Sequence, residues 1–188
     1  MKLTRAMFLD RDGVINEEIG YLHRQQDVRF VPGVFSLCRA AQGSGYRVFI
    51  ITNQSGIARG LYSEADFHGL MDWMRAEFAR EQVELAAVYF CPFHPVHGIG
   101  EYRREHEDRK PGTGMLRRAA REFGLDLSRS IMVGDRCSDV AAANAAGLEK
   151  AFLLSGTESA PCGGDYLAVT ALGDVEAWIE ASSKQGDV

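Results

Sequence analysis

The first apolar run of the chain reads Ala6-Met7-Phe8-Leu9 and passes directly into Asp10-Arg11-Asp12-Gly13-Val14. A short, continuous apolar run without alternation predicts a strand that is buried on both faces of a sheet. Two carboxylates two residues apart at the end of such a strand can face a common cleft, and their repulsion favours a cation between them. Hard oxygen ligands suit Mg²⁺. The alternative interpretation of an isolated D-x-D-G is a turn that contains Asp and Gly.

The rest of the chain alternates short apolar runs with amphipathic segments. Further strands are expected at residues 46–51, 86–90, 130–133, 151–154 and 166–169, and helices at about 33–42, from Ser63 onward, 115–123, 140–146 and 175–179. This alternation predicts an α/β fold, a Rossmann-like doubly wound and mostly parallel sheet with helices on both faces. One domain is expected over residues 1–188, with a segment between the first two strands too short for a large cap domain. The segment of residues 91–110 is rich in Pro, Gly and His and has weak periodicity, which predicts a long functional loop or a disordered one.

Polar residues follow the predicted strands, at the sheet edge where ligands of open α/β sheets bind. After the second strand, residues 52–60 read Thr-Asn-Gln-Ser-Gly-Ile-Ala-Arg-Gly, and a hydroxyl followed by such residues can present backbone N–H groups to an anion. Alone, this stretch is equally a helix cap with a surface loop. After the long loop, Arg109-Lys110-Pro111 offers two cations that can hold a phosphate. Alone, that pair is ordinary solvated surface.

After the fourth strand the chain reads Gly134-Asp135-Arg136-Cys137-Ser138-Asp139. Asp139 lies one helical turn after Asp135 and would share its face. The alternative is a helix N-cap with a first-turn acid. Taken in order, these stretches bring three carboxylates, a hydroxyl and a lysine to one point. That mixture suits Mg²⁺ and phosphate together, because the metal neutralises the acids and the lysine neutralises the phosphoryl oxygens.

The ordered motifs D-x-D-G-V, strand-ending Thr, Lys before Pro, and G-D-x-x-x-D resemble the haloacid dehalogenase superfamily of phosphatases over nearly the whole chain. More narrowly, the chain is similar to the family of D-glycero-D-manno-heptose-1,7-bisphosphate 7-phosphatases, which act in lipopolysaccharide core biosynthesis. This similarity rests on residues 10–16, 20–21, 52–60 and 109–111. Histidinol-phosphate phosphatases share much of the pattern and are the nearest alternative.

The resemblance implies a two-step hydrolysis. Asp10 would be the nucleophile that forms an aspartyl-phosphate, and Asp12 the general acid of the first step and the base of the second. Mg²⁺ would be bound by Asp10, Asp135 and the backbone carbonyl of Asp12. Thr52 and Lys110 would hold the phosphoryl group.

The resemblance also implies supporting and substrate-binding residues. Asp139 would orient either the water shell of the metal or Lys110. The expected substrate-binding residues are Gly20, Tyr21, Asn53, Gln54, Ser55, Arg59, Arg109 and Arg136. Arg136 has an alternative interpretation as a solvated arginine at a helix start.

Many members of this family hold a structural zinc in the long loop through Cys-x-His and Cys-x-Cys. The corresponding residues are Cys91, Phe93, His106 and Asp108. Because Phe93 cannot bind a metal and both later thiolates are missing, we expect that zinc is lost. An alternative ligand set is Cys91, His94, His97 and His106.

The composition of the 188 residues, with a net charge of −5, disfavours a nucleic-acid partner and with it a DNA-end phosphatase. A phosphate-binding module without turnover would not need both Asp10 and Asp12. Apolar runs are too short to span a bilayer and no secretory signal is visible, so a cytoplasmic protein without a membrane partner is expected. The four cysteines, Cys38, Cys91, Cys137 and Cys162, show no paired spacing and are interpreted as reduced thiols. A monomer is expected.

Overall fold

The predicted parallel sheet is present in the computed structural model, which describes residues 3–154 and 161–185. Within these residues the sheet has six strands in the order β3-β2-β1-β4-β5-β6, and each neighbouring pair is parallel. The strands are β1 (Arg5–Leu9), β2 (Tyr46–Asn53), β3 (Leu85–Cys91), β4 (Ile131–Gly134), β5 (Lys150–Leu154) and β6 (Leu167–Val169). The helices are α1 (Val34–Gly43), α2 (Ser55–Ala58), α3 (Glu64–Arg80), α4 (Gly114–Phe123), α5 (Cys137–Ala146) and α6 (Leu172–Gln185), with short 3₁₀ helices η1 (Gln25–Asp27), η2 (Gly100–Tyr102) and η3 (Leu127–Arg129).

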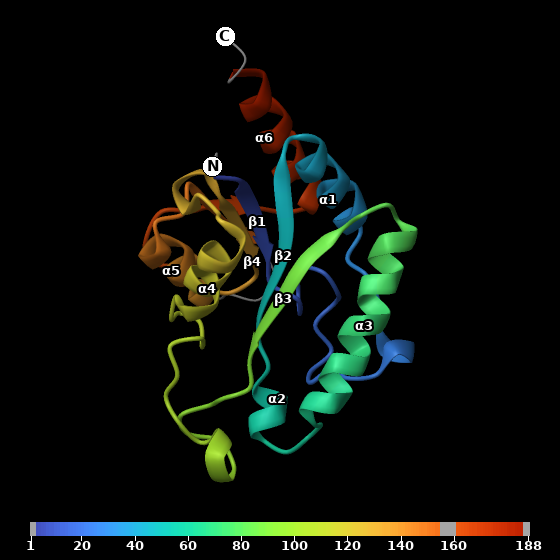
Figure 1. Ribbon diagram of the computed structural model, residues 1–188, viewed down its shortest axis with the longest axis vertical. Coiled ribbons are helices and arrows are strands. Elements are labelled where there is room, and N and C mark those ends of the chain that lie inside the picture. Colours follow the sequence, from blue (N-terminus) through green and yellow to red (C-terminus); the bar gives the residue numbers. More distant parts are fainter. Residues whose placement is uncertain (1–2, 155–160, 186–188) are drawn as a thin grey trace.

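Strand β1 is buried on both faces, as its continuous apolar run predicts. Ala6 and Phe8 belong to the core under α4 and α5, whereas Met7 and Leu9 belong to the core under α1 and α6. All four side chains are 0% exposed. The split follows from the geometry of a strand, in which successive side chains point to opposite faces. Figure 1 shows the two helical layers, with α4 and α5 on one side of the sheet and α1, α3 and α6 on the other.

The strand order reverses at β1, which pairs with β2 on one side and with β4 on the other. In doubly wound sheets this reversal opens a crevice at the carboxyl ends of the strands. Between β1 and β2 the chain forms only η1 and α1, so no cap domain is inserted there. The long loop runs from the end of β3 to the start of α4 and contains only η2.

Two helices begin earlier than their apolar patterns indicate. The pattern of α5 starts at Val140, but the helix starts at Cys137 because the Asp139 carboxylate accepts a hydrogen bond from Arg136 N, 3.1 Å away. The pattern of α6 runs only from Val175 to Ile179, whereas the helix begins at Leu172, which is also buried. Helix α2 has four residues and was not predicted. Among the described residues, no helix combines the length and apolar character needed to cross a bilayer.

Candidate active site

The polar residues predicted from the ends of β1, β2 and β4 meet at the carboxyl edge of the sheet. Asp10 follows β1, Thr52 lies near the end of β2, and Asp135 follows β4. Lys110 comes from the long loop and is fixed there by Asn53. The Asn53 side chain accepts from Lys110 N and donates to Lys110 O, both at 3.0 Å. Asn53 was expected to bind substrate, but its amide holds the backbone of Lys110.

The Lys110 ammonium lies between two carboxylates and is 3% exposed. Its Nζ is 3.0 Å from Asp10 Oδ1 and 2.5 Å from Asp139 Oδ1, and it donates to the Ile51 carbonyl at 2.9 Å. These three acceptors match the three N–H groups of an ammonium. Burial alone would lower the pKa of Lys110, but the two carboxylates outweigh it and raise the pKa. Of the two roles expected for Asp139, this contact favours the orientation of Lys110.

Three buried carboxylates, those of Asp10, Asp135 and Asp139, each place an oxygen within 4.8 Å of the others. Burial raises the pKa of Asp10 to about 7, with Lys110 opposing the shift and the neighbouring acids adding to it. Burial and Asp139 raise the pKa of Asp135 to about 6. One lysine therefore does not neutralise the cluster. Oxygen donors with excess negative charge fit a hard divalent cation.

Gly13 allows the loop after β1 to approach Asp135. Its φ is +87°, and a Cβ at this position would lie 2.3 Å from Asp135 Oδ2. Any side chain at position 13 would therefore displace a carboxylate of the cluster.

Asp12 lies beside the cluster, where five hydrogen bonds hold its carboxylate. The donors are Arg11, Asn16 and Gln54. Gln54 was expected to bind substrate, but it is 2% exposed and its amide joins Asp12 to Thr52 Oγ1, at 3.1 and 2.8 Å. The sequence pattern assigns no role to Arg11 or Asn16, although both lie in the stretch that carries the family resemblance.

A cavity of about 540 Å³ opens in front of these residues. Asp10, Asp12, Thr52 and Lys110 line it. Of the expected substrate-binding residues, it is lined by Gly20, Tyr21, Asn53, Gln54, Ser55, Arg109 and Arg136. Arg59 is not among the lining residues; its guanidinium carbon lies 5.9 Å from the centre of the Tyr21 ring. The lining also includes Glu18, whose carboxylate lies 3.4 Å from the Arg136 guanidinium.

The four positions that the family resemblance aligns with a zinc site carry other contacts in this chain. The Phe93 ring stacks on His106 with centres 4.6 Å apart, and the Arg104 guanidinium lies 3.9 Å from the Phe93 ring centre. Asp108 pairs with Arg118 at 3.2 Å. Cys91 is buried and free. Stacking and an ion pair therefore fasten this loop, and the loss of zinc stays a prediction.

The alternative zinc ligands are not gathered into a site. His94 and His97 have ring centres 4.7 Å apart, but His94 Nδ1 accepts hydrogen bonds from backbone N–H groups. Within the described part of the chain, the aspartate cluster is the only group of at least three potential ligands whose donor atoms lie within 4.8 Å of one another.

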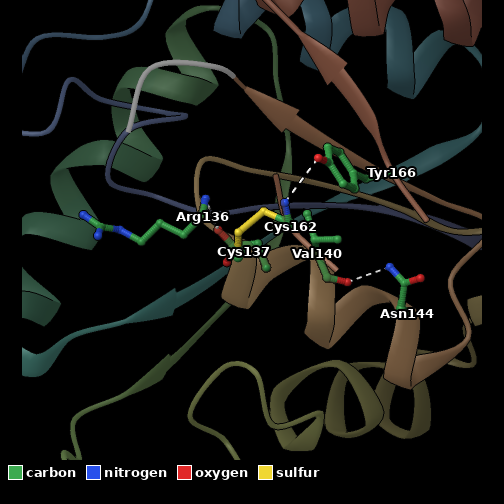
Figure 2. Close-up of a disulfide and its surroundings, with 7 residues drawn as sticks. Arg136, Cys137, Val140, Asn144, Cys162 and Tyr166 are labelled. Atoms are coloured by element: carbon green, nitrogen blue, oxygen red, sulfur yellow. Dashed lines mark hydrogen bonds between the residues drawn. A yellow bond between two sulfur atoms is a disulfide. The ribbon is translucent and has the colours of Figure 1, made fainter. Parts of the chain in front are cut away.

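Two of the four cysteines form a disulfide, so the expectation of reduced thiols is wrong for Cys137 and Cys162. Their Cα atoms are 5.1 Å apart, although 25 residues separate them in sequence. Cys137 begins α5 beside Arg136, and Cys162 lies in the segment that returns after β5, where its N–H donates to Tyr166 Oη at 3.3 Å (Figure 2). Scattered spacing could not reveal the pair because only the fold brings these segments together.

Replacing Cys162 with Ser should lower the free energy of unfolding by about 3 kcal/mol, because the bond closes a loop of some 25 residues. Urea unfolding of the oxidised protein, of the same protein with dithiothreitol and of the variant would measure this. The reduced wild type should match the variant. Equal stability of all three samples would contradict the prediction.

Comparison with known proteins places these features in one family. The HAD-hydrolase-like family model matches residues 108–169. The D-glycero-alpha-D-manno-heptose-1,7-bisphosphate 7-phosphatase of Burkholderia mallei is 48% identical over 151 residues, 80% of each chain. The D-glycero-beta-D-manno-heptose-1,7-bisphosphate 7-phosphatase of Vibrio cholerae is 44% identical over 90% of this chain and 91% of its own.

Solved structures agree with these relatives. The D,D-heptose 1,7-bisphosphate phosphatase from B. bronchiseptica, complexed with magnesium and phosphate, superposes with a TM-score of 0.79 at 28% identity, covering 95% of this chain and 99% of that one. A putative HAD-like phosphatase from Mesorhizobium loti has a TM-score of 0.85 at 33% identity, covering 95% and 87%. The chain therefore belongs to the heptose-1,7-bisphosphate 7-phosphatase family of the haloacid dehalogenase superfamily.

Proposed function

We propose that the protein is an Mg²⁺-dependent phosphatase that removes the C7 phosphate of D-glycero-D-manno-heptose 1,7-bisphosphate in the biosynthesis of the lipopolysaccharide core. The observation that carries the proposal is the pairing of Asp10 with Lys110 at the cavity wall, where their side chains lie 3.0 Å apart, together with Asp135, which places a carboxylate oxygen within 4.8 Å of one from Asp10. This is the arrangement that phosphoryl transfer requires, since its catalysis rests mainly on positioning and charge stabilisation. The substrate follows from the relatives, which carry this activity in their names.

Asp10 is the nucleophile in this proposal. Its carboxylate oxygen attacks phosphorus and the bond to the C7 oxygen breaks, while Asp12 gives its proton to that oxygen. In the second step, Asp12 takes a proton from water as the water oxygen attacks the aspartyl-phosphate. The phosphorus–Asp10 bond then breaks, so phosphate leaves and both carboxyl groups return to their starting states. Lys110 and Thr52 hold the phosphoryl oxygens.

Asp10, Asp135 and the backbone carbonyl of Asp12 would bind Mg²⁺. When bound, the ion would neutralise the carboxylates and the charge that develops on the phosphoryl oxygens. Asp139 keeps Lys110 charged and aimed at the reacting group, through the 2.5 Å contact between their side chains.

The sugar and its second phosphate occupy the cavity beyond Lys110. Arg109 and Arg136 line that cavity and carry the positive charge that a second phosphate needs, with Gly20, Tyr21 and Ser55 beside the sugar. Asn53 and Gln54 act indirectly, because their amides are engaged inside the protein. We place the enzyme in the cytoplasm as a monomer. The net charge of −5 supports the absence of a nucleic-acid partner.

A substrate panel tests this function. Specificity constants should be compared, with Mg²⁺ present, for both anomers of heptose 1,7-bisphosphate, for histidinol phosphate and for fructose 1,6-bisphosphate. One heptose anomer should give the highest value. If histidinol phosphate gave the highest value instead, the substrate would be wrong while the phosphatase chemistry stood.

Magnesium should stabilise the protein more at pH 8 than at pH 5. The pKa values of Asp10 and Asp135 are raised to about 7 and about 6, so their contribution to stability is fully present below the unfolded value of 3.8 and is lost as pH rises through the raised values. Mg²⁺ binds the ionised carboxylates and offsets this loss, by about 2.7 kcal/mol at 100 times its dissociation constant. Thermal melts with Mg²⁺ or a chelator at both pH values would measure the shift. The variant Asp135→Asn should show little shift at either pH, and an equal shift of the wild type at both would contradict the prediction.

A further inference from the structure

Arg11, the residue between the two motif aspartates, is the largest side chain buried completely in the described residues, with 0% exposure. Its guanidinium carbon lies 5.7 Å from the centre of the Phe67 ring, and its Nη2 donates to the Leu22 carbonyl at 2.9 Å. Buried arginine is costly unless it is paired, because its charge leaves water. Its charged partner is Asp12.

The contact between Arg11 and Asp12 uses both carboxylate oxygens. Arg11 Nε donates to Oδ1 at 3.0 Å, and Nη2 lies 2.8 Å from both Oδ1 and Oδ2. Two amides add to this grip: Asn16 Nδ2 donates to Oδ1 at 3.0 Å and Gln54 Nε2 donates to Oδ2 at 3.1 Å. Although Asp12 lines the cavity, with 19% of its side chain exposed, its carboxylate cannot turn without breaking these bonds.

A second chain of contacts fixes the far side of Gln54. Tyr62 Oη donates to Gln54 Oε1 at 2.5 Å, while Gln54 Nε2 also donates to Thr52 Oγ1 at 2.8 Å. Tyr62 packs so closely on Gly56 that a Cβ there would lie 2.1 Å from its ring. Asp12 and Thr52 are therefore held in a fixed relation to each other.

Stability alone does not explain this arrangement. The pairing leaves Arg11 Nη1 buried with no hydrogen-bond partner. A buried ion pair adds little to stability compared with apolar residues of similar volume. Where a chain keeps such a local cost, a functional reason is expected.

We infer that Arg11 is a positioning residue, which holds the Asp12 carboxyl at the cavity wall in the orientation for proton transfer to the leaving oxygen. Gln54 and Tyr62 support the same orientation from the opposite side. This inference rests on the proposed function, because it gives Asp12 the role of the acid. Arg11 acts through Asp12 and has no contact with substrate.

The dependence on the leaving group tests the inference. A sugar phosphate releases a poor leaving oxygen that needs a proton, whereas 4-nitrophenyl phosphate releases a phenolate that does not. The variant Arg11→Met should lower kcat/KM for heptose bisphosphate by about 10² to 10³, within the range of general acid catalysis, and that for 4-nitrophenyl phosphate by less than about 10-fold. The specificity constant is the readout because it reports the step in which the leaving group departs. A purely structural role would lower both constants equally, and that result would overturn the inference.

Further variants separate the explanations. Arg11→Lys keeps the positive charge but loses the planar guanidinium that contacts both carboxylate oxygens. Its ratio of the two specificity constants should therefore lie between those of the wild type and Arg11→Met. In an Asp12→Asn background, Arg11→Met should add no further loss for the sugar phosphate; additive losses would overturn the inference. Arg47→Met, which removes a half-buried arginine stacked on Phe123, is the matched control and should leave the ratio of the two constants unchanged.

The test gives a clear answer even if Arg11→Met does not fold or the natural substrate is not the heptose bisphosphate. If Arg11→Met does not fold, Tyr62→Phe is the substitute, because it keeps the ring on Gly56 and removes the hydroxyl that bonds Gln54 and interacts with Arg11. It should shift the ratio in the same direction by a smaller factor, and an unchanged ratio would overturn the inference. The comparison works with any sugar phosphate that the wild type hydrolyses. A wrong substrate assignment would thus be revealed by the substrate panel of the wild type. A wrong role for Arg11 would be revealed only by the ratio of the two specificity constants in the variants.

Discussion

Replacing Asp10 with Asn should lower turnover by about 10⁴-fold or more while the protein stays folded, because an amide oxygen cannot form the aspartyl-phosphate. The amide oxygen of the substituted side chain would still accept the hydrogen bond that Arg11 N gives to Asp10 Oδ1 at 2.7 Å. Activity on the best substrate of the panel, measured with Mg²⁺ present, checks the prediction. A variant that kept more than about one hundredth of the activity would remove Asp10 as the nucleophile.

The same variant has an expected effect on stability. Burial and the neighbouring acids raise the pKa of Asp10 to about 7, so the ionised carboxylate destabilises the metal-free fold at neutral pH. Asp10→Asn removes that charge while Asp139 still pairs with Lys110. The melting temperature without metal should therefore equal or exceed that of the wild type at pH 8. Asp72→Asn, an exposed change on α3, is the matched control and should alter neither activity nor melting temperature.

The meeting of Asp10 and Asp135 could be predicted because it depends on topology alone. Each of these residues follows a strand whose apolar pattern is strong, and the carboxyl ends of parallel strands share one edge of the sheet. Lys110 comes from the long loop, where Asn53 fixes its backbone. The same reasoning predicted β1, whose four apolar residues divide between the two cores. Local pattern and global fold agree at these positions, which is why sequence reasoning succeeds there.

The partners of individual side chains could not be predicted in this way. Gln54 is expected to bind substrate and lines the cavity, but residue order does not reveal that its amide is hydrogen-bonded to Asp12, Thr52 and Tyr62. The Cys137–Cys162 disulfide joins cysteines 25 residues apart in sequence, a pairing that spacing does not encode. Arginine is a residue type that usually lies on the surface, and only the packing of Phe67 and Leu22 around Arg11 shows that it is buried. Such contacts are set by tertiary structure, so residue type and order leave them open.

Lys110→Met should reduce both stability and activity. Without the ammonium, the buried carboxylates of Asp10 and Asp139 lose their common partner, and breaking a buried pair in this way costs about 3–5 kcal/mol. Because Lys110 lowers the pKa of Asp10, its removal would raise that pKa further. The added destabilisation should thus be larger at pH 8, where Asp10 must ionise, than at pH 5, where Asp10 can stay protonated. Urea unfolding at the two pH values, without metal, measures both effects.

The double variant Lys110→Met with Asp139→Asn separates the two roles of the lysine. Removing the negative charge of Asp139 as well offsets the loss of the positive charge of Lys110, so much of the lost stability should return. Activity should not return, since the phosphoryl oxygens would still lack their ammonium, and the loss of one such group costs about 10²- to 10³-fold in turnover. If the double variant recovered activity together with stability, Lys110 would only balance charge. If the single variant Lys110→Met kept the stability of the wild type, the ion pairs with Asp10 and Asp139 would not support the fold. We expect neither result, because Lys110 lies 3.0 Å from Asp10 and 2.5 Å from Asp139 and all three side chains are buried.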